Sequence, residues 1–184
     1  MSIPPIPPHL VVMGVSGSGK TTVATRVAEL LDRPFAEADD MHPPANVAKM
    51  SAGTPLTDAD REPWLRTVRD WLSAQAEQGH SAVVTCSALR RVYRDVLREA
   101  AGGVRFVHLD GDPELIAARM KERKGHFMPP SLLRSQLDTL EPLQPGEDGV
   151  RVPIAGSPDD IAADALRRLG LQGGHAAAPS GHAE

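Results

Sequence analysis

The chain has 184 residues, 41% of them hydrophobic and 24% charged, and its net charge is −4. This length suits a single domain with a proper core, and a mildly acidic chain is a poor general binder of nucleic acid or of an anionic membrane. The single cysteine, Cys86, rules out an internal disulfide and a multi-cysteine metal site. No apolar run is long enough to cross a bilayer, and the proline-rich N-terminus lacks the pattern of a signal peptide, so we expect a cytoplasmic protein.

Composition separates the two ends of the chain from its middle. Residues 1–8 carry four prolines, and residues 170–184 are rich in glycine, alanine and histidine. Such biased terminal compositions are typical of disorder, so we predict a disordered leader and a disordered tail. One folded domain is expected between them, over residues 9–169.

The spacing of apolar residues predicts strands and helices that alternate. In chain order it predicts a strand over 10–15, a helix over 22–31, a strand over 34–39, a helix over 58–78, a strand over 82–86, a helix over 89–97, a strand over 104–109, helices over 113–123 and 132–140, a strand over 150–154 and a last helix ending at Leu169. Thr57 and Ser157 are predicted helix N-caps. The alternation predicts an α/β fold in which helices cover both faces of a parallel five-stranded sheet. Ligands of such sheets bind beyond the carboxyl ends of the strands.

A phosphate-binding motif lies between the first predicted strand and the first predicted helix. Residues 14–21 (GVSGSGKT) fit the pattern G-x-x-x-x-G-K-[ST] at every fixed position. Glycines let the backbone fold around phosphate oxygens, while backbone N–H groups and the helix N-terminus supply positive charge. We expect Lys20 to reach the β and γ phosphates of ATP and the Thr21 hydroxyl to ligate Mg²⁺. The predicted nucleotide-binding residues are Gly14, Val15, Ser16, Gly17, Ser18, Gly19, Lys20, Thr21 and Thr22.

Other motifs narrow the class of nucleotide-binding protein. A GTPase needs an N-K-x-D motif, but the one asparagine, Asn46, is followed by Val47. A motor or AAA-type ATPase is normally larger and carries an apolar strand that ends in Asp-Glu, which is not visible here. A small kinase of the P-loop class remains.

Two arginines support a kinase. Arg119 and Arg123 lie four residues apart near the end of a predicted helix, in one row with Leu115. A lid-like segment, over residues 121–142, begins beside them, so both side chains could reach a transferring phosphoryl group. The alternative is a solvated helix face, since Lys121, Glu122 and Lys124 are neighbours.

Acidic residues end the second predicted strand. Glu37, Asp39 and Asp40 stand there, and strand alternation favours Asp39 as the functional carboxylate. An acid at this place can enter the Mg²⁺ shell or accept the proton of an attacking hydroxyl. The alternative is a polar loop cap.

Several further blocks resemble one family. Besides the phosphate loop, they are residues 39–43 (DDMHP), 46–50 (NVAKM), 53–58 (GTPLTD), 60–65 (DREPWL), 86–90 (CSALR), 93–94 (YR) and 123–127 (RKGHF). In order and over nearly all of residues 10–170, they resemble the gluconokinases of the bacterial and animal small-kinase type. Two departures stand out, because Arg90 replaces a common lysine and Glu37 replaces a common aspartate.

The resemblance implies a reaction and a fold. The reaction transfers the γ-phosphoryl group of ATP to the 6-hydroxyl of D-gluconate. The fold is close to that of the shikimate and nucleoside monophosphate kinases, commonly in a homodimer. A shikimate-like kinase and an ATP-binding regulatory protein without turnover are the alternatives.

Gluconate carries a carboxylate and several hydroxyls, and arginine binds carboxylates in a bidentate way. Within the resembling blocks, the predicted substrate-binding residues are Asp39, His42, Arg61, Arg90, Arg94 and His126. The arginines are candidates for the carboxylate, although Arg94 could be a helix-surface charge instead. His42 and Asp39 are candidates for the hydroxyls. The predicted catalytic residues are Lys20, Asp39, Arg119 and Arg123.

Overall fold

A parallel sheet forms the centre of the molecule. The structure, a computed structural model, describes residues 6–122 and 130–171. Its strands are β1 (His9–Met13), β2 (Phe35–Glu37), β3 (Val83–Thr85), β4 (Val104–Asp110) and β5 (Gly149–Pro153). They pair in the order β2-β3-β1-β4-β5, with every pair parallel. The predicted fold class is confirmed.

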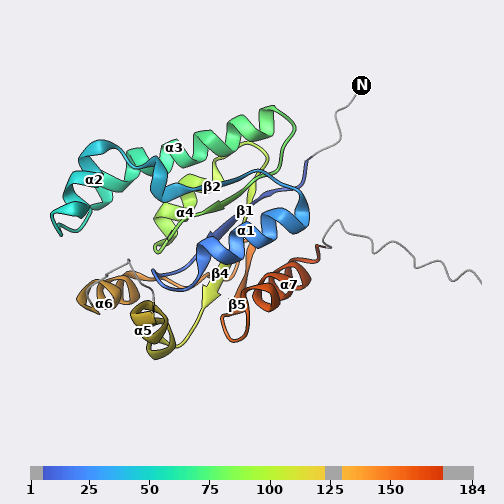
Figure 1. The fold of residues 1–184 in the computed structure, drawn as a ribbon. Helices are drawn as coiled ribbons and strands as arrows, with labels where there is room; N and C mark the ends of the chain where they lie inside the picture. The colour runs from blue at the N-terminus through green and yellow to red at the C-terminus, as the bar shows by residue number, and fades with distance from the viewer. Residues whose placement is uncertain (1–5, 123–129, 172–184) are drawn as a thin grey trace, which may run out of the picture.

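Helices cover both faces of this sheet. They are α1 (Lys20–Leu31), α2 (Pro44–Ser51), α3 (Asp58–Glu77), α4 (Arg91–Arg98), α5 (Pro113–Glu122), α6 (Pro130–Thr139) and α7 (Pro158–Leu169). A short 3₁₀ helix, η1 (Ala38–Met41), follows β2. Helices α2, α5 and α6 gather at one end of the molecule, at the left of Figure 1. Strand β4 leads into α5 at that end, so it is the end where the parallel strands finish. Within the described part of the chain, no helix combines the length and apolar character of a membrane span.

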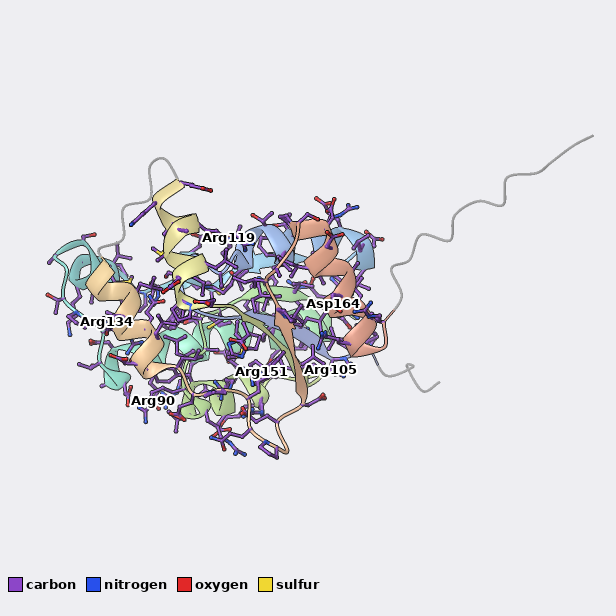
Figure 2. All side chains as sticks on the ribbon, turned by 90° about the horizontal axis from the view of Figure 1, so that it is seen from below. Arg90, Arg105, Arg119, Arg134, Arg151 and Asp164 are labelled. Carbon is purple, nitrogen blue, oxygen red and sulfur yellow. The ribbon has the colours of Figure 1, made fainter. Side chains whose placement is uncertain are left out.

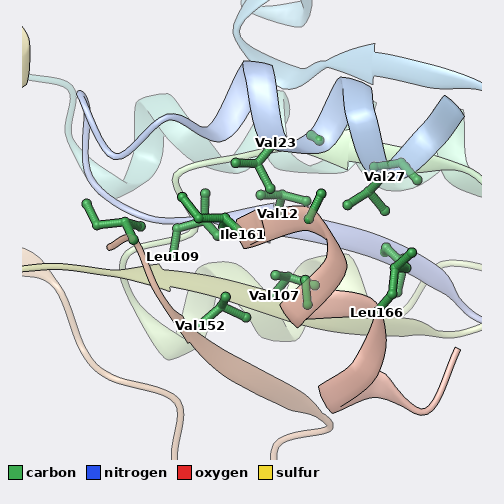
Figure 3. Close-up of a cluster of buried hydrophobic side chains, with 14 of the residues drawn as sticks. Val12, Val23, Val27, Val107, Leu109, Val152, Ile161 and Leu166 are labelled. Carbon is green, nitrogen blue, oxygen red and sulfur yellow. The ribbon is translucent and has the colours of Figure 1, made fainter. Parts of the chain in front are cut away.

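The core has two halves, one on each face of the sheet. Residues alternate between them along β1: Leu10 and Val12 pack on the first side, and Val11 and Met13 on the second. Both faces of β1 are buried, so Leu10 to Met13 are consecutive apolar residues instead of alternating with polar ones. Figure 3 shows the first half, where α1 and α7 cover the strands. Helices α3 and α4 cover the second half.

Local sequence signals account for the helix ends. Thr57 and Ser157 are N-caps, as predicted, and each forms a capping box with the aspartate three residues later. In the first box, the Thr57 hydroxyl accepts from the Asp60 N–H at 3.1 Å, and the Asp60 carboxylate accepts from the Thr57 N–H at 2.9 Å. Helix α3 therefore begins at a fixed point, which matters because its first turn carries Arg61.

Two local predictions fail. The strand predicted over 34–39 ends at Glu37, because the chain turns into η1, where the Ala38 carbonyl accepts from the Trp64 indole at 2.6 Å. Strand alternation therefore says nothing about Asp39. Helix α2 was not predicted, although Pro44 at its first turn is a typical start signal.

The predicted domain limits, residues 9 and 169, remain predictions. Residues 1–5 and 172–184, in the predicted leader and tail, lie outside the described residues. Just before β1, the carbonyl of Pro7 accepts from Ser81 at 2.5 Å, and that of Pro8 accepts from Arg33 at 3.2 Å.

Candidate active site

The loop between β1 and α1 is shaped by glycines. A Cβ on Gly14 would lie 2.9 Å from the Ser18 hydroxyl and 3.0 Å from the Leu109 carbonyl, so no larger residue fits. Gly19, at φ +88°, is the N-cap of α1 in a left-handed conformation that glycine adopts without strain. The Ser18 hydroxyl is buried and donates to the Val15 carbonyl at 2.7 Å. These contacts fix the loop in front of the N-terminus of α1, where anions are stabilised.

The loop's lysine lies over its own backbone. The Lys20 ammonium donates to the carbonyls of Gly14 at 3.0 Å and Val15 at 3.1 Å. Thr21 follows in the first turn of α1 and is exposed, as is Thr22. The loop therefore places an ammonium, a hydroxyl and a helix N-terminus together, as phosphate binding requires.

Helices α5 and α6 both contact this loop. The side-chain carbonyl of Gln136 on α6 accepts from the Ser16 N–H at 2.7 Å, and its amide donates to the Ser16 hydroxyl at 3.1 Å. A Cβ on Gly17 would collide with Met120 of α5. Gln136 had been placed on a helix by its spacing, but no sequence signal linked it to a loop 120 residues earlier.

Asp39 follows β2, which is two strands away from β1 in the sheet. It is exposed in η1, directly after β2, and β3 lies between β2 and β1 in the sheet. Cys86 follows β3 and feels the charges of both Asp39 and Lys20, so it lies between the acid and the phosphate loop. Burial raises the pKa of the Cys86 thiol to about 12, which leaves it protonated and without a nucleophilic role.

His42 is held against the start of α3. Its ring stacks on Trp64 with centroids 4.0 Å apart and planes 16° apart. Its Nδ1 lies 3.2 Å from the side-chain amide of Asn46 on α2. Burial lowers the pKa of His42, the charge of Asp39 raises it and the charge of Arg61 lowers it, so these three predicted site residues share one neighbourhood.

Arg61 and Arg90 both lie over the ring of one tyrosine, Tyr93. Their guanidinium carbons lie 5.4 Å and 5.7 Å from the centre of the Tyr93 ring. Arg61 donates to the Tyr93 hydroxyl at 3.2 Å and to the Leu56 carbonyl at 2.6 Å. Asp58 accepts from Arg90 at 2.5 Å and from the Tyr93 hydroxyl. The cluster of Asp58, Arg61, Arg90 and Tyr93 offers two guanidinium groups and a hydroxyl, which suits a carboxylate.

Arg94 lies outside this cluster, in the core. Its side chain is fully buried and donates to Glu147 at 2.7 Å and 3.1 Å and to the Ala88 carbonyl at 2.8 Å. Glu147 is equally buried and also accepts from Arg98. An arginine whose charge is satisfied internally does not face a substrate, so we correct the predicted substrate-binding role of Arg94 to a structural one.

Of the two predicted lid arginines, the structure describes Arg119 but not Arg123. Arg119, labelled on α5 in Figure 2, donates to the Ile154 carbonyl at 2.8 Å, which engages one of its five N–H donors. Arg90 lies by contrast near the end of α6, where it donates to Glu141 at 3.3 Å. Arg123 and His126 fall outside the described residues.

Tyr93, Asp58 and Asn46 were missed as candidates. Tyr93 lies in a predicted helix, and its hydroxyl joins the arginine cluster because α4 packs beside the start of α3. Asp58 and Asn46 both lie in blocks that carry the family resemblance, which is the one signal that could have singled them out.

The fold and this site define a P-loop kinase. A family model described as an AAA domain matches residues 10–143. Chain length and the lack of an apolar strand ending in Asp-Glu argue against an AAA-type ATPase, and this match shows that those two criteria do not exclude every protein with the AAA description. The chain is 53% identical over 165 residues to a gluconokinase of Gluconobacter oxydans, covering 92% of that protein.

Solved structures agree with this similarity. An unliganded sugar kinase from Janibacter is 53% identical, with a TM-score of 0.84 over 90% of this chain and 95% of that one. A gluconokinase from Sinorhizobium meliloti is 48% identical, with a TM-score of 0.82 over 90% and 93% of the two chains. The chain therefore belongs to the gluconokinase family. A shikimate kinase from Aquifex aeolicus shares the fold at 15% identity and a TM-score of 0.55, covering 88% of this chain and 96% of that one.

Proposed function

We propose that the protein transfers the γ-phosphoryl group of ATP to the 6-hydroxyl of D-gluconate, releasing ADP and 6-phospho-D-gluconate. One observation carries this proposal beyond family membership. The phosphate loop follows β1 and the acid Asp39 follows β2, at the same edge of the sheet with only β3 between them, and the charges of Asp39 and Arg61 both act on His42. This arrangement supports a phosphate donor site and an arginine-lined acceptor site at one edge of the sheet.

The phosphate side uses the loop between β1 and α1. Its N–H groups and the N-terminus of α1 would bind the phosphates, and Lys20 would follow the γ-phosphoryl group during transfer. Mg²⁺ fits here: the Thr21 hydroxyl is exposed beside Lys20 and makes no hydrogen bond within the described residues, and nucleotide-bound Mg²⁺ takes few protein ligands. When bound, the ion would neutralise phosphate charge, with Thr21 as its protein ligand.

The acceptor side uses the arginine cluster and the segment from η1 to α2. Arg61 and Arg90 would bind the gluconate carboxylate, and His42 would bind a hydroxyl. The oxygen of the gluconate 6-hydroxyl would attack the γ phosphorus while Asp39 accepts the hydroxyl proton. The bond between the γ phosphorus and the bridging oxygen then breaks, and that oxygen leaves with ADP. Water must be kept out, since it would otherwise accept the phosphoryl group.

The lid, over residues 121–142, would supply this exclusion. Arg119 and Arg123 are proposed to contact the γ phosphate when the lid closes, and His126 to contact substrate. The hydrogen bonds of Gln136 to Ser16 support a link between the lid and the nucleotide, because they join α6 to the phosphate loop. We also propose a homodimer, which light scattering of the purified protein would test.

A coupled assay of ADP release tests the activity. The protein is given Mg-ATP with D-gluconate, shikimate, glycerate or a nucleoside monophosphate, and ATP binding is measured separately. Turnover with gluconate alone is the expected result. Turnover with a different acceptor would support the assignment as a kinase and would refute gluconate as its substrate. ATP binding without any turnover would favour a regulatory protein instead.

A further inference from the structure

Asn46 bridges two residues of the acceptor side. It lies on α2 and is 4% exposed. Its side-chain nitrogen is 2.9 Å from the backbone carbonyl of Asp60 and 3.2 Å from Nδ1 of His42. Both contacts are made by the same atom, and this restricts the chemistry of the histidine.

The carbonyl of Asp60 settles which end of the amide faces it. A carbonyl oxygen only accepts hydrogen bonds, so the Asn46 atom beside it must be the NH₂ group. One of its two hydrogens points to that carbonyl, and the other is left for His42. The nitrogen of an amide does not accept, so Nδ1 of His42 must be the acceptor. The imidazole is then neutral, with its proton on Nε2.

The ring is fixed in orientation as well as in protonation. It stacks on Trp64, whose own indole N–H is held by the Ala38 carbonyl at 2.6 Å. Within the described part of the chain, Nε2 of His42 makes no hydrogen bond, and it is not among the buried polar atoms that lack a partner. The Nε2–H group is therefore a fixed donor that solvent and ligands can reach.

Two charged side chains act on the His42 ring. Asp39 in η1 favours a protonated ring, while Arg61 in α3 opposes it. Lys49, on α2 with Asn46, is paired instead with the Asp60 carboxylate at 2.8 Å. Protonation of Nδ1 would set two donors against each other, because Asn46 has no acceptor to offer while its amide is held by the Asp60 carbonyl.

We propose that Asn46 is a positioning residue that holds His42 as the Nε2–H tautomer, so that His42 donates a hydrogen bond to an oxygen of the acceptor substrate. On this view His42 takes no proton during transfer, and Asp39 alone accepts it. The identity of the acceptor oxygen rests on the proposed function. The tautomer itself does not.

Nitrogen-15 NMR tests the tautomer without any substrate. In two-bond ¹H–¹⁵N spectra of the full chain at pH 7.5, His42 should show an unprotonated Nδ1 and a protonated Nε2. Its signals are identified by their loss in His42→Gln. In Asn46→Asp, a carboxylate faces Nδ1 and should draw the proton to that atom. A proton on Nδ1 in the wild type, or an unchanged pattern in Asn46→Asp, would overturn the proposal. Should Asn46→Asp not fold, the wild-type spectrum decides alone.

Kinetics then test what the tautomer is for. Asn46→Asp should raise KM for gluconate about tenfold, the usual effect of losing one hydrogen bond, and leave KM for ATP unchanged. Lys49→Met is the matched control, since it breaks another contact between α2 and Asp60 without touching His42. The side-chain amide of Gln can donate a hydrogen bond but has no tautomer to fix. In the His42→Gln variant, Asn46→Asp should therefore change KM for gluconate very little.

Equal effects of Asn46→Asp and Lys49→Met would mean that Asn46 only anchors α2, and would refute the positioning role. A protein that shows the expected tautomer but never turns over gluconate would refute the proposed function and leave the tautomer standing.

Discussion

The buried pair of Arg94 and Glu147 yields a stability prediction with a defined pH dependence. Burial alone raises the pKa of Glu147, but hydrogen bonds from Arg94, from the Gln144 N–H and from Arg98 outweigh it and lower this pKa from 4.5 to about 2. The folded state thus favours the ionised carboxylate. A depressed pKa means that this stabilisation is complete well above pH 4.5 and is lost as the pH falls toward 2.

The size of the effect follows from that difference in pKa. A pKa lowered from 4.5 to about 2 corresponds to about 3 kcal/mol at pH 7, to about 2 kcal/mol at pH 3.5 and to well under about 1 kcal/mol at pH 2. Glu147→Gln keeps the size of the side chain and removes its charge. It should therefore lower the free energy of unfolding by these amounts, consistent with the cost of breaking a buried ion pair.

Urea unfolding at 25 °C between pH 7 and pH 3.5 measures this difference. Glu99→Gln is the control, because Glu99 pairs with Arg69 but has a side chain 62% exposed. Its effect should be small at every pH. The kcat/KM of Glu147→Gln for gluconate should stay within about twofold of wild type while the protein is folded. A loss below about 1 kcal/mol at pH 7, or one independent of pH, would refute the reasoning.

Three further predictions concern the site. Lys20→Ala should lower kcat by about 10² or more, since one preorganised charge is lost, and a variant with full activity in the ADP-release assay would contradict the scheme. Asp39→Asn should lower kcat by about 10² or more with little change in KM for ATP, as expected for a proton acceptor. A KM for ATP that rises by the same factor as kcat falls would point to a role of Asp39 in nucleotide binding instead. Gln136→Leu removes both hydrogen bonds to Ser16, so the Ser16 amide should exchange with deuterium about tenfold faster; unchanged exchange would mean that the contact does not protect the loop.

Features with local causes were predictable from the sequence. The phosphate loop is such a feature, because its glycines, Lys20 and Thr21 are adjacent in the chain and each has its own physical reason. The caps Thr57 and Ser157 are similar, since both partners of each capping box lie within three residues. The parallel sheet was predictable because strands that are buried on both faces have continuous apolar runs.

Features that depend on distant segments were not predictable. Glu147 pairs with Arg94 across 53 residues of sequence, and Gln136 contacts Ser16 across 120. Helix α2 was missed because its exposed Val47 and Met50 do not form a core-facing pattern. Strand alternation favours Asp39 but does not apply in η1, so the proposed role of Asp39 is supported instead by the effect of its charge on His42.

The exposure of an arginine's partner decides whether that arginine can bind a substrate. Arg90 and Arg94 lie four residues apart near the start of α4, and both contact a carboxylate. The Asp58 carboxylate beside Arg90 is 60% exposed, so water replaces that contact readily and a substrate carboxylate can take its place. The Glu147 carboxylate beside Arg94 has no exposed surface, so releasing it would leave two buried charges unpaired. Both arginines are candidates for the substrate carboxylate by sequence, whereas the burial of Glu147 commits Arg94 to the core and the exposure of Asp58 leaves Arg90 able to exchange its partner.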